Sequence, residues 1–130
     1  MTFFQAVSSV LGKYATFHGR APRSELWWFT LFGVLAPWIA GLLDLVLFHG
    51  VYFVQHGETQ ALSPLYSLAQ LALLIPSFAV GARRFHDMNR TGWWQLLIFT
   101  GIGAFVVLVW FMFKGTEGPN RFGPDPLGQF

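Results

Sequence analysis

The sequence has no cysteine and few charged residues. Without cysteine, the 130-residue chain can form no disulfide, no reactive thiolate and no Cys-ligated zinc site. Asp, Glu, Lys and Arg make up 11% of the residues, against roughly 25% in a typical soluble domain. Apolar residues make up 54% and the mean hydropathy is +0.49. So much apolar surface has no soluble core to fill, so the composition predicts an all-α membrane protein of a few helices.

The net charge is also small. Eight Lys and Arg stand against six Asp and Glu, which gives a formal charge of +2. Bulk attraction to nucleic acid is therefore not indicated, and what matters is where the charges fall. We expect membrane lipids, a membrane-protein partner or a second copy of the chain as partners, and no nucleic acid.

Three long apolar stretches lie at residues 26–48, 64–82 and 93–113. As helices they would be roughly 28 to 35 Å long, which matches a hydrocarbon core of about 30 Å. Ser63 and Pro64 suit the N-cap and the first turn of the second helix. We therefore predict three transmembrane helices in a single membrane domain over residues 1–130.

The flanking segments have a different character. Residues 2–15 place apolar side chains on one helical face, which predicts an amphipathic helix lying in the membrane interface. Residues 114–130 contain repeated Gly and Pro, which forbid a helix or a central strand. The predicted fold is thus an interfacial helix, three transmembrane helices and an irregular C-terminal tail.

The basic residues are distributed unevenly between the loops. Six of the eight precede the first span or separate the second from the third, namely Lys13, Arg20, Arg23, Arg83, Arg84 and Arg90. The loop over 49–63 contains no Lys or Arg. By the positive-inside rule, the N-terminus and the Arg-rich loop are cytoplasmic and the 49–63 loop is on the other side.

The last apolar stretch leaves two topologies open. With three full spans the tail lies outside, so that six basic residues are inside and Lys114 and Arg121 are outside. If the region over 100–103 instead folds the stretch back as a re-entrant hairpin, all eight basic residues are inside. We favour three spans, because irregular backbone at membrane depth must be buried in protein.

Small residues share one face of the first predicted span. At helical spacing this face carries Gly33, Ala36, Pro37, Ala40, Gly41 and Asp44. Small side chains let a neighbouring helix approach closely, and a polar group inside lipid usually faces the bundle. The alternative for Asp44 is a solvated position, since it lies about one turn from the outer end of its helix.

Charged and aromatic residues cluster where the first, second and third predicted spans meet one membrane face. The polar group consists of Arg20, Arg23, Arg83, Arg84, His86, Asp87 and Arg90, and the flanking interface anchors are Trp27, Trp28, Trp93 and Trp94. Clustered Arg can form paired hydrogen bonds to phosphate, which suits anionic lipid headgroups. The alternative is a topology signal with internal ion pairs from Glu25 or Asp87 to Arg.

Four motifs along the chain resemble a known family. They read FHGRAPRSELWW at 17–28, RRFHD at 83–87, TGWW at 91–94 and GTEGPNRFGPDP at 115–126. Together they are similar to the bacterial inner-membrane family called domain of unknown function 805. The resemblance implies a small integral membrane protein of the bacterial inner membrane, and it implies no activity, substrate or cofactor.

Two classes of function follow from these residues. The first is a non-enzymatic membrane module whose cytoplasmic Arg and Trp surface binds anionic lipid or a protein partner. The second is a small transporter or a lipid-modifying enzyme that uses Asp44, His86 and Asp87. We favour the first, because Asp44 is the one acidic residue inside a predicted span. His86 with Asp87 lacks the further ligands of a metal site, so we expect no metal and no cofactor.

Overall fold

A computed structural model describes residues 2–48, 52–61 and 63–129 of the chain. Its elements are, in order, α1 (Phe3–Gly12), α2 (Arg23–Leu47), β1 (Tyr52–Gln55), β2 (Glu58–Ala61), α3 (Pro64–Asp87), the 3₁₀ helix η1 (Gly92–Thr100), α4 (Ile102–Met112) and the 3₁₀ turn η2 (Pro126–Gln129). The described chain is mainly helical, as the composition predicts. The short β-hairpin between α2 and α3 was not predicted.

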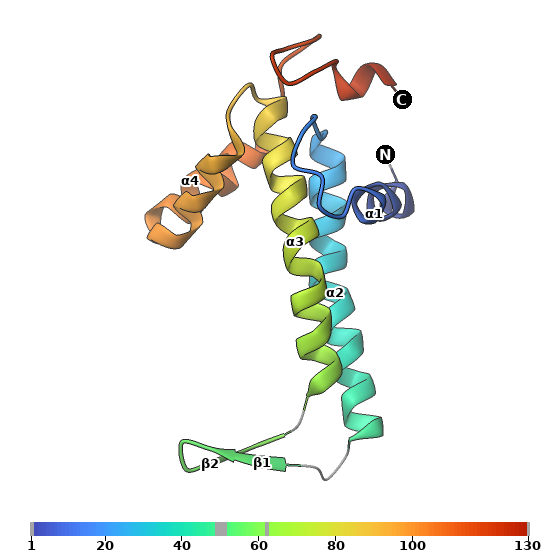
Figure 1. The fold of residues 1–130 in the computed structure, drawn as a ribbon, viewed down its shortest axis with the longest axis vertical. Helices are drawn as coiled ribbons and strands as arrows, with labels where there is room; N and C mark the ends of the chain where they lie inside the picture. Colours follow the sequence, from blue (N-terminus) through green and yellow to red (C-terminus); the bar gives the residue numbers. More distant parts are fainter. Residues whose placement is uncertain (1, 49–51, 62, 130) are drawn as a thin grey trace.

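Helices α2 and α3 form a long antiparallel pair that is the axis of the molecule (Figure 1). At 1.5 Å per residue they are about 36 to 38 Å long, so either one can cross a bilayer. Both are apolar enough to span, and their large apolar side chains point outward, as at Trp38, which is 68% exposed. Helix α3 continues to Asp87 rather than ending at 82.

The two ends of this pair differ in character. We call the end with the first residue of α2 and the last residue of α3 the Arg end, and the opposite end the β end. At the β end, β1 pairs with β2 through a tight turn whose central residues, His56 and Gly57, have φ of 52° and 80°. Positive φ at both positions is what a two-residue hairpin turn requires.

The face of α2 that meets α3 is the one with small residues. Pro37 and Asp44 are buried, whereas apolar positions on other sides of the helix, such as Val46, are exposed. A Cβ added at Gly41 would lie 3.6 Å from Tyr66 Cδ2 of α3, which is an ordinary contact. A Cβ added at Gly33 would meet nothing within 4 Å. Of these two glycines, Gly41 is therefore the one that contacts α3.

We predict that Gly41→Leu destabilises the protein, because the larger side chain would collide with Tyr66. Overpacking of this kind costs about 1–3 kcal/mol. Val46→Leu is the matched control, since Val46 is 76% exposed. The melting temperature of each variant in detergent measures the difference. Equal melting temperatures for the two variants would contradict a helix contact at Gly41.

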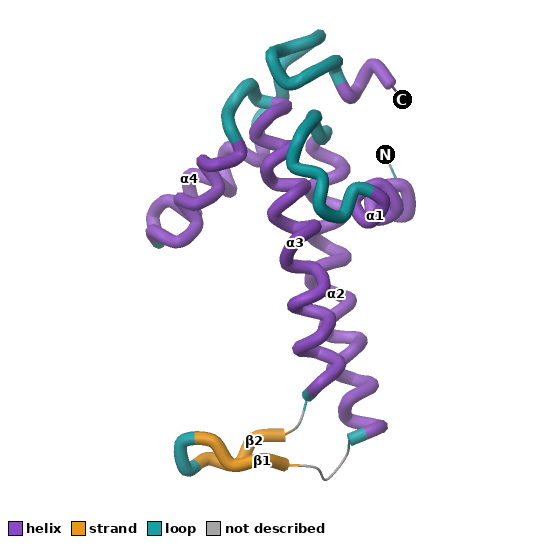
Figure 2. The backbone as a smooth tube through the Cα atoms, in the orientation of Figure 1, coloured by secondary structure: helices purple, strands orange, loops and turns teal. Residues whose placement is uncertain are grey.

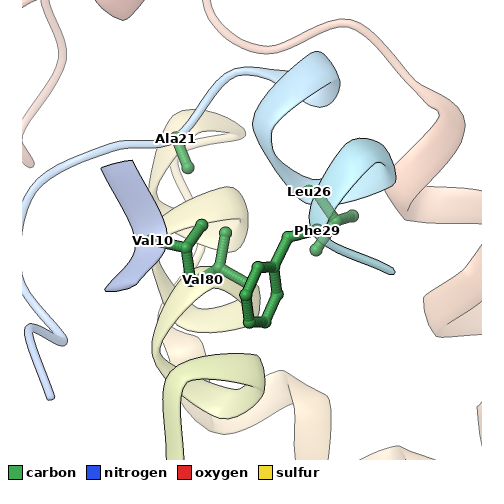
Figure 3. Packing of buried hydrophobic residues seen from close by; sticks show 5 residues of the cluster. All are labelled: Val10, Ala21, Leu26, Phe29 and Val80. Atoms are coloured by element: carbon green, nitrogen blue, oxygen red, sulfur yellow. The ribbon is translucent and has the colours of Figure 1, made fainter. Parts of the chain in front are cut away.

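Helix α1 packs across the first half of α2 and is seen nearly end-on in Figure 1. It begins with a capping box, in which Thr2 and Gln5 each bind the backbone of the other. Its buried residue Val10 joins a small core whose other members come from the following loop, α2 and α3, namely Ala21, Leu26, Phe29 and Val80 (Figure 3). The core therefore ties the amphipathic helix to the Arg end.

The prediction of one continuous helix over 93–113 is wrong. The segment forms η1 and α4, which fold back on each other at Gly101, where φ is 74° and ψ is −81°. Thr100 stabilises the reversal, because its hydroxyl accepts a hydrogen bond from Gly103 N at 3.1 Å. Gly103 admits no side chain, since an added Cβ would lie 2.2 Å from the carbonyl oxygen of Leu97.

The consequence of this reversal is visible at the Arg end. Helix α4 returns the chain to the last turn of α3, and the tail then lies over that end as a loop followed by η2 (Figure 2). Gln95 fixes the hairpin to α3, because its Nε2 donates to the carbonyl oxygen of Phe78 at 3.2 Å. All four sequence motifs therefore meet at one end of the molecule.

Candidate functional site

The loop before α2, the end of α3 and the tail converge at the Arg end. Backbone hydrogen bonds join them directly: Ala21 N donates to Arg83 O at 3.0 Å, and Thr116 N donates to Asp87 O at 2.7 Å. Between these segments lies a buried group that we call the Arg cluster, made of Arg20, Glu25, Arg83, Arg84 and Asp87.

Asp87 links two guanidinium groups. Its Oδ1 accepts from Arg20 Nε at 2.9 Å and lies 2.8 Å from Arg20 Nη2, while Oδ2 accepts from Arg84 Nη1. All three side chains are at least 90% buried. A buried charge must be paired to be tolerated, and here one carboxylate neutralises part of two cations.

Arg20 and Arg84 also bind carbonyl oxygens of neighbouring segments. Arg20 Nη1 donates to Gly118 O at 2.7 Å and to Gly123 O at 3.2 Å, and its Nη2 donates to Thr116 O at 2.6 Å. Arg84 donates to Ala21 O at 3.2 Å and to Phe113 O, which directly follows α4. Arg20 thus fastens the tail to the cluster through several carbonyls at once.

Arg83 has a different partner. Its Nη1 donates to Glu25 Oε1 at 2.7 Å, and the same oxygen accepts from Ser9 Oγ of α1 at 3.3 Å. Arg83 Nε and Nη2 are buried and have no hydrogen-bond partner within the described part of the chain. The cluster therefore holds three cations against two carboxylates, and one positive charge is not neutralised inside it.

His86 and Asp87 do not act as a pair. His86 Nδ1 lies 2.9 Å from Gly19 O, and its ring stacks on Phe122 with centroids 4.1 Å apart. Asn120 Nδ2 donates to His86 O at 2.9 Å. The His86 side chain thus helps to seat the loop and the tail, whereas the Asp87 carboxylate is engaged by arginine.

Asp44 lies at the opposite end of the molecule. Its two oxygens accept from Leu65 N at 3.0 Å and Tyr66 N at 2.9 Å, so it caps the first turn of α3 from a neighbouring helix. Asp44 and Asp87 are separated by most of the length of α3, about 33 Å. Asp44, His86 and Asp87 therefore do not share a site.

The remaining cations of the Arg end are exposed. Four of them make up a group that we call the cationic rim, namely Arg23, Arg90, Lys114 and Arg121. The guanidinium of Arg90 lies 4.5 Å from the Trp110 ring, and that of Arg121 lies 4.7 Å from the Phe122 ring. Three of the predicted Trp anchors are exposed here, namely Trp28, Trp93 and Trp94, and Trp27 is half-buried.

The tail is shaped by residues that sequence reasoning did not assign. Asp125 accepts hydrogen bonds from Gly118 N and Leu127 N, and these bonds lower the pKa of its carboxyl below the ordinary value. Gly118 and Gly123 have φ of 72° and 133°, which favours glycine there. The spacing of glycines in the sequence indicated the turns of the tail. It did not indicate that backbone carbonyls of the tail would bind Arg20.

Among the cavities near this end, one has Arg83 in its wall and another has His86. A polar one of about 280 Å³ is lined by Lys13, Thr16, His18, Gly19, Arg20, Arg83, Phe122, Pro124 and Pro126. A largely apolar one of about 790 Å³ lies between α3 and η1, with Leu74, Phe78 and Trp93 among its walls and His86 at one side. Across residues 2–48, 52–61 and 63–129, no group of three His, Cys, Asp or Glu side chains lies together as a metal site.

Two apolar helices long enough to span a bilayer, with a buried Arg–carboxylate cluster at one end, are typical of an integral membrane protein. The family described as "Protein of unknown function (DUF805)" matches residues 14–124, and the chain belongs to this family. The resemblance seen in the four motifs is thus confirmed.

Relatives in Escherichia coli K12 place the family in a membrane. The chain is 43% identical to "Inner membrane protein YhaI" over 119 residues, which covers 91% of this chain and 92% of that protein. It is 38% identical to "Inner membrane protein YhaH" over 118 residues, with 90% and 92% covered. "Uncharacterized protein YiiR" is 28% identical over an alignment 137 positions long, which covers 85% of each chain. No solved structure matches the chain.

Proposed function

We propose that the protein crosses the inner membrane twice and that η1 and α4 form a re-entrant hairpin. A 3₁₀ helix of nine residues is about 18 Å long and an α-helix of eleven is about 16 Å, roughly half of a 30 Å hydrocarbon core. The hairpin reverses beside α3, so the tail lies at the Arg end with α1. Both termini would then be cytoplasmic.

The distribution of charge supports this topology. All eight Lys and Arg fall in segments of the Arg end, whereas the loop over 49–63 has none. Three full spans would have put Lys114 and Arg121 outside. Two spans and a hairpin satisfy the positive-inside rule for every basic residue. Helix α1, which lies across α2, would rest in the cytoplasmic interface with Phe4 and Leu11 in lipid.

Single-cysteine labelling tests the topology, and the chain has no cysteine of its own to remove. We expect Glu58→Cys to react with an impermeant maleimide from the periplasm, and Glu117→Cys to react only after the inner membrane is permeabilised. Both positions are exposed, so the comparison is matched. Reaction of Glu117→Cys in intact spheroplasts would instead support three spans.

We further propose that the protein is a non-enzymatic membrane module whose cationic rim binds anionic lipid headgroups. The observation that carries this proposal is that the rim cations are exposed together at one end, beside Trp28, Trp93 and Trp94. Basic residues at a membrane surface each contribute about 1 kcal/mol toward anionic lipid. Arg20 and Arg84 are engaged internally, so the rim takes the role first expected of them.

Native mass spectrometry of the purified protein with phosphatidylglycerol and phosphatidylcholine tests the proposal. The triple variant Arg23→Gln, Arg90→Gln, Arg121→Gln should lose its preference for phosphatidylglycerol. The matched control changes the same three positions to Lys, which keeps the charge and should keep the preference. Unchanged selectivity in the Gln variant would refute lipid binding by the rim and leave a protein partner or a second copy as the occupant.

A transporter or lipid-modifying enzyme is the weaker alternative. The three side chains proposed for it do not come together, because Asp44 caps α3 at the β end while Asp87 is held by two arginines at the Arg end. His86 contacts a backbone carbonyl and an aromatic ring. No observation on these residues favours this alternative over the membrane module.

A further inference from the structure

We propose that the polar cavity beside Arg83 is a binding site for a phosphate group, separate from the cationic rim. The cavity lies between the loop after α1, the end of α3 and the tail, and its volume is about 280 Å³. Because a cavity needs only about 10–15 Å³ of such space to hold one water, there is room for a phosphate group together with water.

The first support is the unused edge of the Arg83 guanidinium. Arg83 is 1% exposed and lines the cavity, and its Nη1 is engaged by Glu25. Nε and Nη2 are without a partner among the described residues, although buried polar atoms are normally hydrogen-bonded. Nε and Nη2 carry neighbouring N–H groups that lie in the guanidinium plane and point outward along one of its edges. That is the edge with which arginine binds two oxygens of a phosphate.

The second support is the charge of the cluster. Arg20, Arg83 and Arg84 are buried with the carboxylates of Glu25 and Asp87, so one positive charge is left over. An uncompensated buried charge is costly, and an anion in the cavity would remove that cost. The nearby Asp125 interacts electrostatically with Arg20, but among the described residues its oxygens accept from Gly118 N and Leu127 N and not from Arg83.

The third support is the remaining wall of the cavity. Lys13 and His18 add a cation and a ring nitrogen, Thr16 adds a hydroxyl, and the lining contains no carboxylate. An ammonium, a hydroxyl and a forked pair of N–H groups suit an anion with several acceptor oxygens and more than one negative charge. A phosphate group meets this description better than a carboxylate does.

The phosphate could belong to a lipid headgroup or be free in solution, and the two arms of one experiment separate these sources. The full-length protein is purified in a neutral detergent and its melting temperature is followed with inorganic phosphate or with dihexanoyl phosphatidic acid. Sodium chloride at the same ionic strength is the reference. A ligand that binds the folded protein raises the melting temperature. A shift with both ligands indicates a free phosphate site, and a shift with the lipid alone indicates a headgroup site; either result supports the proposal.

Two variants connect the shift to the cavity. Arg83→Lys keeps a cation for Glu25 but loses the forked edge, so about tenfold more ligand should be needed for the same shift. Lys13→Gln changes an exposed residue at the cavity and should weaken binding without affecting folding, which keeps the test valid if Arg83→Lys does not fold. Glu58→Gln, an exposed change at the β end and outside both the cavity and the rim, should leave the shift unchanged.

The outcomes also separate this site from the rim. Lys13 lines the cavity and is not a rim residue. Loss of the shift in Lys13→Gln, with retention in Glu58→Gln, therefore supports the cavity even if the rim shows no lipid selectivity. The proposal is overturned if neither ligand raises the melting temperature above the chloride reference. It is equally overturned if the shift persists unchanged in Lys13→Gln and in folded Arg83→Lys.

Discussion

Asp87→Asn is expected to abolish a stable fold or to lower its melting temperature severely. Asp87 is the carboxylate for both Arg20 and Arg84, and all three side chains are buried. Removing one partner of a buried ion pair costs about 3–5 kcal/mol, because the other charge is left without compensation. Here two cations would lose their partner together, which is comparable with the total stability of about 5–15 kcal/mol of a typical domain.

Glu117→Gln is the matched control for this prediction. It removes the same charge from the same end of the molecule, but Glu117 is exposed and forms no ion pair within the described residues. Thermal melting and size-exclusion chromatography in detergent measure both variants. If Asp87→Asn melts within a degree or two of Glu117→Gln, the Arg cluster does not stabilise the fold as argued.

The two long helices could be predicted because their signals are local. Each helix is predicted from its own segment of the sequence. Each contains a run of apolar residues long enough to cross a bilayer, and Ser63 and Pro64 mark the start of the second. The small-residue face of α2 follows from helical periodicity alone. The pairing of Asp44 with the start of α3 does not, because it joins residues more than twenty positions apart.

The last apolar stretch shows why hydropathy did not suffice. One long helix and two short helices that fold back on each other have the same composition, so the mean hydropathy over 93–113 cannot distinguish them. The difference lies in Thr100, Gly101 and Gly103, which form a reversal only because the chain also finds partners on α3. Those partners come from tertiary packing, which the sequence pattern does not specify.

The candidate site was predictable in its members but not in their contacts. The sequence groups Arg20, Arg83 and Arg84 at one membrane face, yet it does not reveal whether a guanidinium faces lipid or a carboxylate. The fold decides this. The Asp87 carboxylate binds Arg20 and Arg84, and a backbone carbonyl of the tail accepts a further hydrogen bond from Arg20. Other arginines that the sequence places at the same membrane face, such as Arg90, are exposed.

Gly115→Ala is expected to detach the tail from the Arg end. A Cβ at Gly115 would lie 1.8 Å from Asp87 Oδ2, 2.4 Å from its Cγ and 3.0 Å from its carbonyl oxygen. Neither group can move easily, because the carboxylate is held by Arg20 and Arg84 and the carbonyl belongs to helix α3. The tail must therefore shift, and Arg20 would lose its carbonyl acceptors beyond Gly115.

We expect Gly115→Ala to lower the free energy of unfolding by at least about 1–3 kcal/mol, which is the usual cost of overpacking. A faster cleavage of the tail by protease in detergent, together with a lower melting temperature, would record it. Gly33→Ala is the control, since an added Cβ there meets nothing within 4 Å and alanine favours a helix over glycine. Because both changes add one methyl group, a difference between them isolates the contact with Asp87. Equal melting and equal cleavage would show that the tail does not depend on its close approach to Asp87.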